Sequence, residues 1–321
     1  MKHLNQLILA AASITQAGTM AAQTLNWVEL GSPAARSSTS MAYDGATKST
    51  VLFGGDNNAH EYLGDTWIWR GTWLQMSPVT SPSPRDGAAM AYDGAGGNIV
   101  LFGGESSTGT YFNDTWTWDG TTWTQQSPPV SPSARVANMT YDAATQTVVL
   151  FGGNNSTIAL GDTWTWNGVT KTWTQQNPTT SPSPRGAPVA YDAATQTVVL
   201  FGGSANGGVQ FTDTWNWNGT TWTQQFPASA PPARTGANMT YDAVLGRVVL
   251  FGGYAGNWPN SLNDTWVWNG ITWTEIQPAT VPPNRYGFGM DYDPINKVVL
   301  MFGGYGSGPA RGDTWLLALA P

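Results

Sequence analysis

Residues 85–123 read RDGAAMAYDGAGGNIVLFGGESSTGTYFNDTWTWDGTTW, and the same pattern occurs six times along the 321-residue chain. Each copy contains an arginine, a Tyr-Asp pair, a Phe-Gly-Gly triplet and an Asp-Thr-Trp triplet, and the first five copies end in a further tryptophan. The arginines are Arg36, Arg85, Arg135, Arg185, Arg234 and Arg285, and the Asp-Thr-Trp triplets begin at Asp65, Asp114, Asp162, Asp213, Asp264 and Asp313. A period of about fifty residues is typical of repeat proteins, in which each copy forms one structural unit.

Four strands are predicted in each repeat. The first runs up to Tyr-Asp (88–92), and the second is rich in β-branched residues (147–151). The third begins at Asp-Thr-Trp, where two tryptophans two residues apart share one face of the sheet, and the fourth carries the last tryptophan (122–125). Because the tryptophans recur in nearly every copy, we expect them to form the core between repeats. Asp-Gly and Asn-Gly pairs predict tight turns between the third and fourth strands, and Pro-rich segments predict crossings to the next repeat.

The two ends of the chain complement each other. Residues 24–30 resemble residues 271–276, which form the end of the fifth repeat, whereas the sixth repeat stops near residue 317 without such an ending. We therefore expect the N-terminal segment to supply the missing strand and close a ring without exposed sheet edges. This predicts one domain over residues 23–321. Its repeats lie near 36–73, 85–123, 135–173, 185–222, 234–273 and 285–317, the last joined by 24–30.

The spacing of the motifs shows which loops vary. Ten residues separate Tyr-Asp from Phe-Gly-Gly in every copy, as between Tyr43 and Phe53, whereas 11 to 13 separate Phe-Gly-Gly from Asp-Thr-Trp. In an up-and-down sheet, the loop from the second to the third strand emerges at the same end as the crossing to the next repeat. We call this end the loop face and the opposite end the turn face. Variation is predicted to gather on the loop face.

The arginine, the Gly-Gly pair that closes the second strand and the later spaced aromatic pair resemble kelch repeats. Six copies cover residues 27–317. The resemblance implies an all-β, six-bladed β-propeller with four antiparallel strands per blade, the first lining a central channel and the fourth outside. The Phe-Gly-Gly and Asp-Thr-Trp variants are similar to those of secreted bacterial kelch proteins, some with galactose-oxidase-like labels.

Residues 1–22 differ from the repeats. Lys2 precedes a short apolar run, and small residues follow at Ala17, Ala21 and Ala22. This pattern predicts a secretory signal peptide, and hence a secreted, periplasmic or cell-envelope protein of a bacterium, although a short buried or disordered arm would also fit. The apolar run is well short of the ~20 residues that span a membrane, so no membrane insertion is expected.

Composition excludes several functions. The net charge of −7 comes mostly from the repeated Arg and Asp residues. The sequence has no stripe of basic residues, so nucleic-acid binding is not expected. There is no cysteine, and the only histidines are His3 and His60. A copper radical site of the galactose-oxidase kind, which needs histidine ligands and a Tyr–Cys crosslink, is therefore excluded. The segment 56–61 is interpreted as a solvated loop, and no metal or cofactor is predicted.

Two sets of residues are candidates for ligand binding. Each arginine is expected to pair with a repeat aspartate and hold one blade to the next, because a guanidinium suits a bidentate carboxylate. In kelch domains that bind acidic peptides, however, arginines at this position contact ligand carboxylates, and Arg85 and Arg285 match that motif best. The second set consists of loop aromatics outside the repeat pattern, Tyr62, Tyr111, Trp258 and Tyr305, which form either a recognition rim or loop anchors.

These features favour a non-enzymatic, monomeric binding module that recognises a glycan or a peptide or protein through the loop face and the channel mouth. One alternative is a cofactor-free enzyme that acts on saccharides, of the mutarotase or lyase type, using channel carboxylates. Asp291, which precedes Tyr292, is the one acidic residue added to a first strand. A structural part of an envelope complex is a further alternative.

Overall fold

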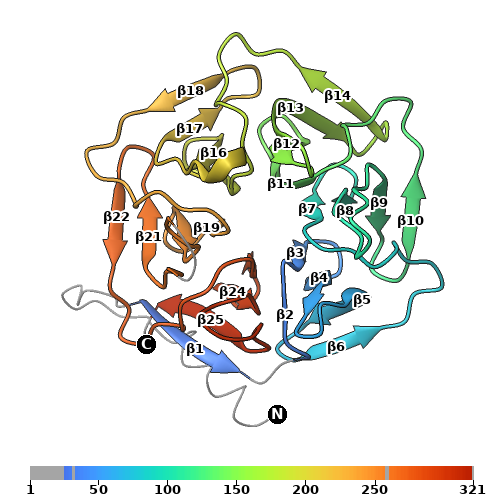
Figure 1. The fold of residues 1–321 in the computed structure, drawn as a ribbon, viewed down its shortest axis with the longest axis horizontal. Helices are drawn as coiled ribbons and strands as arrows, with labels where there is room; N and C mark the ends of the chain where they lie inside the picture. Colours follow the sequence, from blue (N-terminus) through green and yellow to red (C-terminus); the bar gives the residue numbers. More distant parts are fainter. Residues whose placement is uncertain (1–24, 31–32, 257–259, 320–321) are drawn as a thin grey trace.

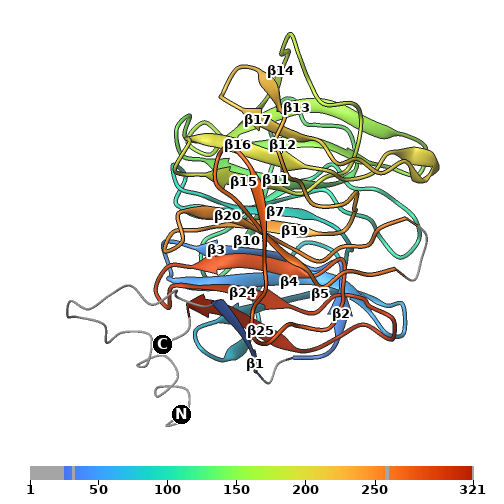
Figure 2. The same cartoon turned by 90° about the vertical axis from the view of Figure 1, so that its left-hand side faces the viewer.

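The computed structural model describes residues 25–30, 33–256 and 260–319. Six antiparallel sheets stand around a central channel as the blades of a propeller, which Figure 1 shows end-on and Figure 2 from the side. The prediction of an all-β, six-bladed propeller is confirmed. In the described part of the chain, one 3-10 turn, η1 (Asn206–Gly208), is the sole helical element, and no helix there is long and apolar enough to cross a membrane.

The strands of blades 1 to 3 follow one another from the channel outward. Blade 1 contains β2 (Arg36–Ser37), β3 (Ser40–Asp44), β4 (Ser49–Asn57), β5 (Tyr62–Trp69) and β6 (Trp73–Met76). Blade 2 contains β7 (Ala89–Asp93), β8 (Asn98–Phe102), β9 (Thr115–Trp118) and β10 (Trp123–Gln126), and blade 3 contains β11 (Val136–Asp142), β12 (Thr147–Asn154), β13 (Ala159–Asn167) and β14 (Thr172–Gln176). The extra short strand β2 pairs with β4, so this sheet has five strands.

Blades 4 to 6 repeat the same order. Blade 4 contains β15 (Val189–Asp192), β16 (Thr197–Phe201), β17 (Thr214–Trp217) and β18 (Trp222–Gln225), and blade 5 contains β19 (Asn238–Asp242), β20 (Arg247–Phe251), β21 (Thr265–Trp268) and β22 (Trp273–Ile276). Blade 6 contains β23 (Gly289–Asp293), β24 (Val298–Phe302) and β25 (Thr314–Leu319), with β1 (Leu25–Leu30) as its outer strand.

Strand β1 closes the ring as the sequence predicts. It pairs antiparallel with β25, and Trp27 lies opposite Leu317 in this register. The final tryptophan of other blades has the equivalent position, for example Trp123 opposite Trp118. Figure 1 shows β1 along the outside of β25, next to blade 1. The sixth blade is therefore built from both ends of the chain.

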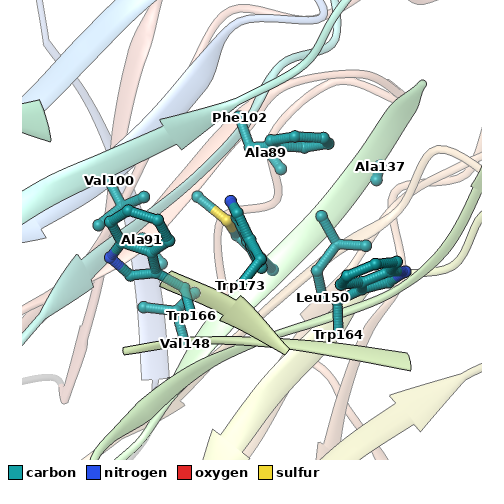
Figure 3. Close-up of a cluster of buried hydrophobic side chains, with 11 residues drawn as sticks. Ala89, Ala91, Val100, Phe102, Ala137, Val148, Leu150, Trp164, Trp166 and Trp173 are labelled. Carbon is teal, nitrogen blue, oxygen red and sulfur yellow. The ribbon is translucent and has the colours of Figure 1, made fainter. Parts of the chain in front are cut away.

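The hydrophobic core lies between neighbouring blades. Figure 3 shows one such cluster, in which Phe102 and Val100 of blade 2 pack with Leu150 and Trp166 of blade 3. These four side chains are fully buried. The second strand of each blade carries apolar residues on both faces. Each blade is therefore packed against a neighbouring blade on both of its sides.

The final tryptophan of a blade joins it to the preceding blade. In blade 4, the Trp222 indole N–H donates to Thr163 Oγ1 at 2.9 Å, and its ring meets Phe151 edge-on with ring centres 5.2 Å apart. Equivalent bonds run from Trp73 to Thr314, Trp123 to Thr66, Trp173 to Thr115 and Trp273 to Thr214. The tryptophans thus form the core between blades, as predicted.

The Gly-Gly pair makes room for the main chain of the next blade. Gly103 and Gly104 have φ of +69° and +96°, in the region that favours glycine. A Cβ on Gly103 would lie 2.4 Å from the Arg135 carbonyl oxygen, which accepts a hydrogen bond from Gly104 N at 2.9 Å. The pair thereby links each blade to the arginine that begins the following one.

Candidate binding site at the loop face

Beyond each Gly-Gly pair, the main chain forms a second, shorter set of bridges at the loop face. Within each blade, the residue after the arginine forms a backbone bridge with the residue after the Gly-Gly pair. In most blades, the residue after the Gly-Gly pair also bridges to a residue in the loop that leads to the third strand. The sets are Ser37–Asp56–Tyr62, Asp86–Glu105–Tyr111, Val136–Asn154–Ala159, Gly186–Ser204–Gln210, Thr235–Tyr254–Ser261 and Tyr286–Tyr305. We call these positions the mouth ladder, because they surround the loop-face opening of the channel. Their backbone arrangement is shared, whereas their side chains differ from blade to blade.

Blades 1 and 2 make one side of the mouth ladder acidic. Burial, together with the carboxylates of Asp56 and Glu105, raises the pKa of Asp86 to about 7, although a hydrogen bond from Ser38 opposes this. Oδ1 of Asp86 and Oδ1 of Asp56 are buried and accept no hydrogen bond from the described residues. This side of the mouth therefore holds carboxylate oxygens with unused acceptor capacity.

The predicted aromatics Tyr62 and Tyr111 belong to this acidic side. Both are half-buried. Burial and the nearby carboxylates, Asp86 first, raise the pKa of Tyr62 to about 12, and burial and Glu105 raise the pKa of Tyr111. His60 is exposed, with Nδ1 3.4 Å from Asp56 Oδ2. No group of histidine, aspartate and glutamate side chains among the described residues is arranged to hold a metal ion.

Blades 5 and 6 make a neighbouring side of the mouth aromatic, since blade 6 adjoins blade 1 in the ring. The ring centres of Tyr254 and Tyr286 are 5.0 Å apart, and those of Tyr286 and Tyr305 are 6.1 Å apart. All three rings are half-buried, so part of each is open to solvent. The structure thus places Tyr305 in a row of three tyrosines, while Trp258 lies outside the described residues.

A cavity of about 210 Å³ lies at the mouth of the channel and is lined by residues of all six blades. Its lining contains no charged side chain and is made of small residues, Phe288 and polar groups that include Ser38, Asn154, Ser204 and Thr235. Asn138 and Asn238 also line the deeper channel cavity of about 340 Å³. The two cavities therefore adjoin one another along the channel axis.

All six arginine side chains are buried and pair with the aspartate of their own blade. Arg135, for example, donates to both carboxylate oxygens of Asp162 at 2.5 and 2.9 Å and to the carbonyl of Gly152 at 3.0 Å. The other pairs are Arg36–Asp65, Arg85–Asp114, Arg185–Asp213, Arg234–Asp264 and Arg285–Asp313. The prediction that each arginine pairs with a repeat aspartate is confirmed, but the prediction that the pair joins one blade to the next is wrong. The pair lies within one blade, and the arginine main chain bonds to the preceding blade instead.

Arg85 and Arg285 share this arrangement with the other four arginines. Arg85 also lies over the ring of Phe112, 4.1 Å from its centre, as Arg185 lies over Phe211. A ligand would have to compete with these internal partners for the guanidinium. Ligand binding by Arg85 and Arg285 stays a prediction.

Asp291 lies in the channel wall at the seam of blades 5, 6 and 1. It accepts hydrogen bonds from Tyr43 N at 2.7 Å, Thr240 Oγ1 at 2.8 Å and Tyr292 N at 2.7 Å. Burial is the main cause that raises the pKa of this carboxyl. Among the residues lining the channel, it is the one carboxylate, and no lysine or arginine of the described residues pairs with it.

Comparison with known proteins identifies the family. The family model for the KLHDC2/KLHL20/DRC7 Kelch-repeats domain matches residues 70–225, which span the last strand of blade 1 and all of blades 2 to 4. This match and the six blades of kelch topology support a kelch-repeat family. A search of curated proteins returns no match. Kelch propellers are typically non-catalytic, and the family and fold indicate a binding or scaffold module.

Sequence reasoning found Tyr62, Tyr111 and Tyr305 of the mouth ladder but missed Tyr254, Tyr286 and most of the polar members. Asp86, Glu105, Asn154 and Thr235 are small or polar residues that do not stand out in a polar loop. The available signal was positional: the residue after each arginine and the residue after each Gly-Gly pair differ in all six copies. Aligning the repeats on these two positions would have identified the acidic side.

Proposed function

We propose that this chain is a binding module that holds a glycan or an extended peptide on the loop face, over the channel mouth. The observation that carries the proposal is the mouth ladder, where six equivalent backbone frames present six different sets of side chains. A rigid frame with variable side chains is the usual construction of a recognition surface. Tyr62, Tyr111 and Tyr305 are the proposed aromatic contacts.

The distribution of chemistry around the ladder supports a single, oriented ligand. Acceptor carboxylates lie on blades 1 and 2, tyrosine rings lie on blades 5 and 6, and an uncharged cavity lies at the centre of the mouth. Such asymmetry gives a ligand different partners on its different sides. A role for Arg85 and Arg285 at the channel mouth, and for Trp258 at the rim, is part of the same proposal.

We also propose that the protein acts outside the cytoplasm, as a secreted, periplasmic or cell-envelope module. This is supported by the basic, apolar and small-residue pattern of residues 1–22. N-terminal sequencing of the mature protein from its native host would test it. A start near residue 23 is expected, and an intact residue 1 would contradict the proposal.

The binding proposal is tested by screening the purified, folded chain on glycan and peptide arrays. We expect at least one class of ligand to bind, and the Tyr62→Ala and Tyr111→Ala double variant to weaken that binding. Gln175→Ala, an exposed amide on the outer strand β14, serves as the control and should bind normally. Absence of binding to both arrays would contradict the proposal.

A cofactor-free enzyme acting on saccharides, of the mutarotase or lyase type, is a second candidate, favoured by Asp291. A channel carboxylate whose pKa is raised and that lacks a cationic partner is typical of acid–base sites. Its three hydrogen-bond donors instead favour a role in holding the blade seam. Release of new products or faster anomer exchange, lost in Asp291→Asn, would favour the enzyme.

A further inference from the structure

We infer that the ligand of the loop face is a neutral saccharide, one ring of which enters the cavity at the channel mouth. This inference rests on the proposed binding function and specifies its ligand class. It is drawn from the size of the cavity, its polar lining, the tyrosine row beside it and the carboxylates at its edge.

The cavity is suited to one small, uncharged, polar group. Its volume of about 210 Å³ is below the roughly 300–1,000 Å³ of pockets that enclose drug-sized molecules. A charged group would be desolvated there without an ion partner in the lining, which is unfavourable. One sugar ring of a longer chain satisfies both conditions, with the rest of the chain lying across the mouth ladder.

The polar lining can both donate and accept hydrogen bonds. Ser38, Asn154, Ser204 and Thr235 reach the cavity from blades 1, 3, 4 and 5. Amides and hydroxyls carry donor and acceptor atoms in one group, as sugar hydroxyls do. The Ser204 hydroxyl donates to Thr235 Oγ1 at 3.0 Å, so part of this lining is already oriented. A ring of hydroxyl groups therefore finds partners on several sides.

The tyrosine row provides a stacking surface at the edge of the cavity. Thr235, which lines the cavity, pairs with Tyr254, and Tyr286 immediately precedes Gly287, another lining residue. A tyrosine ring offers an apolar face and a polar hydroxyl together. The C–H face of a sugar packs against such a ring while its hydroxyls bond to the neighbouring side chains.

The carboxylates on blades 1 and 2 disfavour anionic ligands. A hydrogen bond joins Asp86 to Ser38, and Ser38 and Gly87, the residue after Asp86, both line the cavity. The carboxylates of Asp56 and Glu105 only accept hydrogen bonds, so sugar hydroxyls can donate to them, whereas acidic peptides and uronates are repelled. A basic peptide could pair with Asp56, Asp86 and Glu105 at the rim but would leave the uncharged cavity unused.

The test compares three sets of probes by titration calorimetry with the full chain. The probes are neutral oligosaccharides of hexoses and N-acetylhexosamines, oligogalacturonides, and lysine-rich peptides, each at low and high salt. We expect a neutral oligosaccharide to bind with an affinity that salt leaves unchanged, because no ion pair forms. Asn154→Ala and Thr235→Val should each weaken it about two- to ten-fold, as loss of one hydrogen bond does, while Gln175→Ala should not.

The outcomes separate this inference from the binding function beneath it. Salt-sensitive binding of the lysine-rich peptide, lost in Asp86→Asn, would overturn the saccharide inference and leave the binding function standing. Binding of a neutral saccharide that is equal in wild type, Asn154→Ala and Thr235→Val would overturn the assigned cavity. Failure of a folded chain to bind any probe would overturn both.

Discussion

The two ends of the central channel come from the same six blades but differ in how much they vary. At the turn face, every blade repeats Tyr-Asp, and the aspartate caps its tight turn, as where Asp93 Oδ1 accepts from the backbone N of Ala95 and Gly96 at 3.0 Å. At the loop face, the mouth ladder has no such repetition. Residues that stabilise the propeller recur in every copy, whereas the mouth-ladder residues vary between copies.

This difference separates stability from recognition. The Arg–Asp pairs, the final tryptophans and the Tyr-Asp turns form the frame, and their loss should unfold the propeller. The mouth ladder stands on that frame, and its substitutions should change binding more than stability, apart from Asp86, whose buried carboxyl also affects stability. Five predictions test the contrast.

The largest effect is expected from Arg135→Ala. It removes the partner of Asp162 and the donor to the Gly152 carbonyl at a site where the arginine side chain is fully buried. Breaking a buried pair on one side typically costs about 3–5 kcal/mol. Urea unfolding should show this loss, while Arg247→Ala, at an exposed arginine, should unfold like wild type. Equal midpoints for Arg135→Ala and wild type would contradict a structural role for the pair.

Asp86→Asn should stabilise the protein in a pH-dependent way. The pKa of Asp86 is raised to about 7 in the fold, above its ordinary value of 3.8, so ionisation costs stability as pH rises between these values. The variant should match wild type below about pH 4 and exceed it by on the order of 1–3 kcal/mol above pH 7. Urea midpoints measured across this range provide the check, and a constant difference at all pH values would contradict it.

The acid side should show the opposite sign through the Arg–Asp pairs. Burial alone would raise the pKa of Asp65, Asp162, Asp264 and Asp313, but the arginine bonds outweigh it and lower each pKa. Their stabilisation is complete above the ordinary pKa and is lost as pH falls through the lowered values. The melting temperature should therefore fall steeply below about pH 4. A melting temperature that stays constant there would contradict a stabilising role for the Arg–Asp pairs.

Trp222→Phe should have a smaller effect than Arg135→Ala. It keeps an aromatic ring beside Phe151 but leaves Thr163 Oγ1 without its indole donor. An unpaired buried polar atom and a smaller ring together cost about 1–3 kcal/mol. Phe226→Ala, at a ring that is 85% exposed, is the control and should change the unfolding midpoint little. If Phe226→Ala lowered the unfolding midpoint more than Trp222→Phe, the assignment of Trp222 to the frame would be wrong.

The smallest effect on stability is expected from Asn154→Ala in the mouth ladder. The side chain is exposed, and surface substitutions usually change stability by less than about 0.5 kcal/mol. Its effect should appear in ligand binding instead. A loss of unfolding free energy well above this value would show that Asn154 belongs to the frame, and would contradict the proposed difference between the two ends.

The frame could be predicted from the sequence because each of its features is repeated. The number of repeats predicted six blades, and the likeness of residues 24–30 to the end of the fifth repeat predicted the closing strand, in which Trp27 pairs with Leu317. The sequence also predicted that each arginine pairs with a repeat aspartate, but it did not show that the two residues belong to the same blade. Arg85 and Asp114 lie 29 residues apart in sequence, and their contact depends on where the Gly-Gly bulge places the main chain.

The mouth ladder was only partly predictable. Tyr62, Tyr111 and Tyr305 stood out because large aromatic residues are unusual in polar loops. The closeness of Asp86 and Glu105 depends on a bridge made after the bulge has shifted the register, which no short pattern encodes. Local motifs therefore identified the scaffold, whereas the chemistry of the site required three-dimensional pairing.

Hydrogen–deuterium exchange of the full chain, with and without its bound ligand, tests whether the ligand binds over the mouth ladder. We expect the ligand to slow exchange in the mouth ladder, around residues 86–88, 154, 204, 235 and 286–288, and to leave exchange in the Tyr-Asp turns unchanged. Protection centred on the turn face or on the outer strands, with the mouth ladder unaffected, would contradict it.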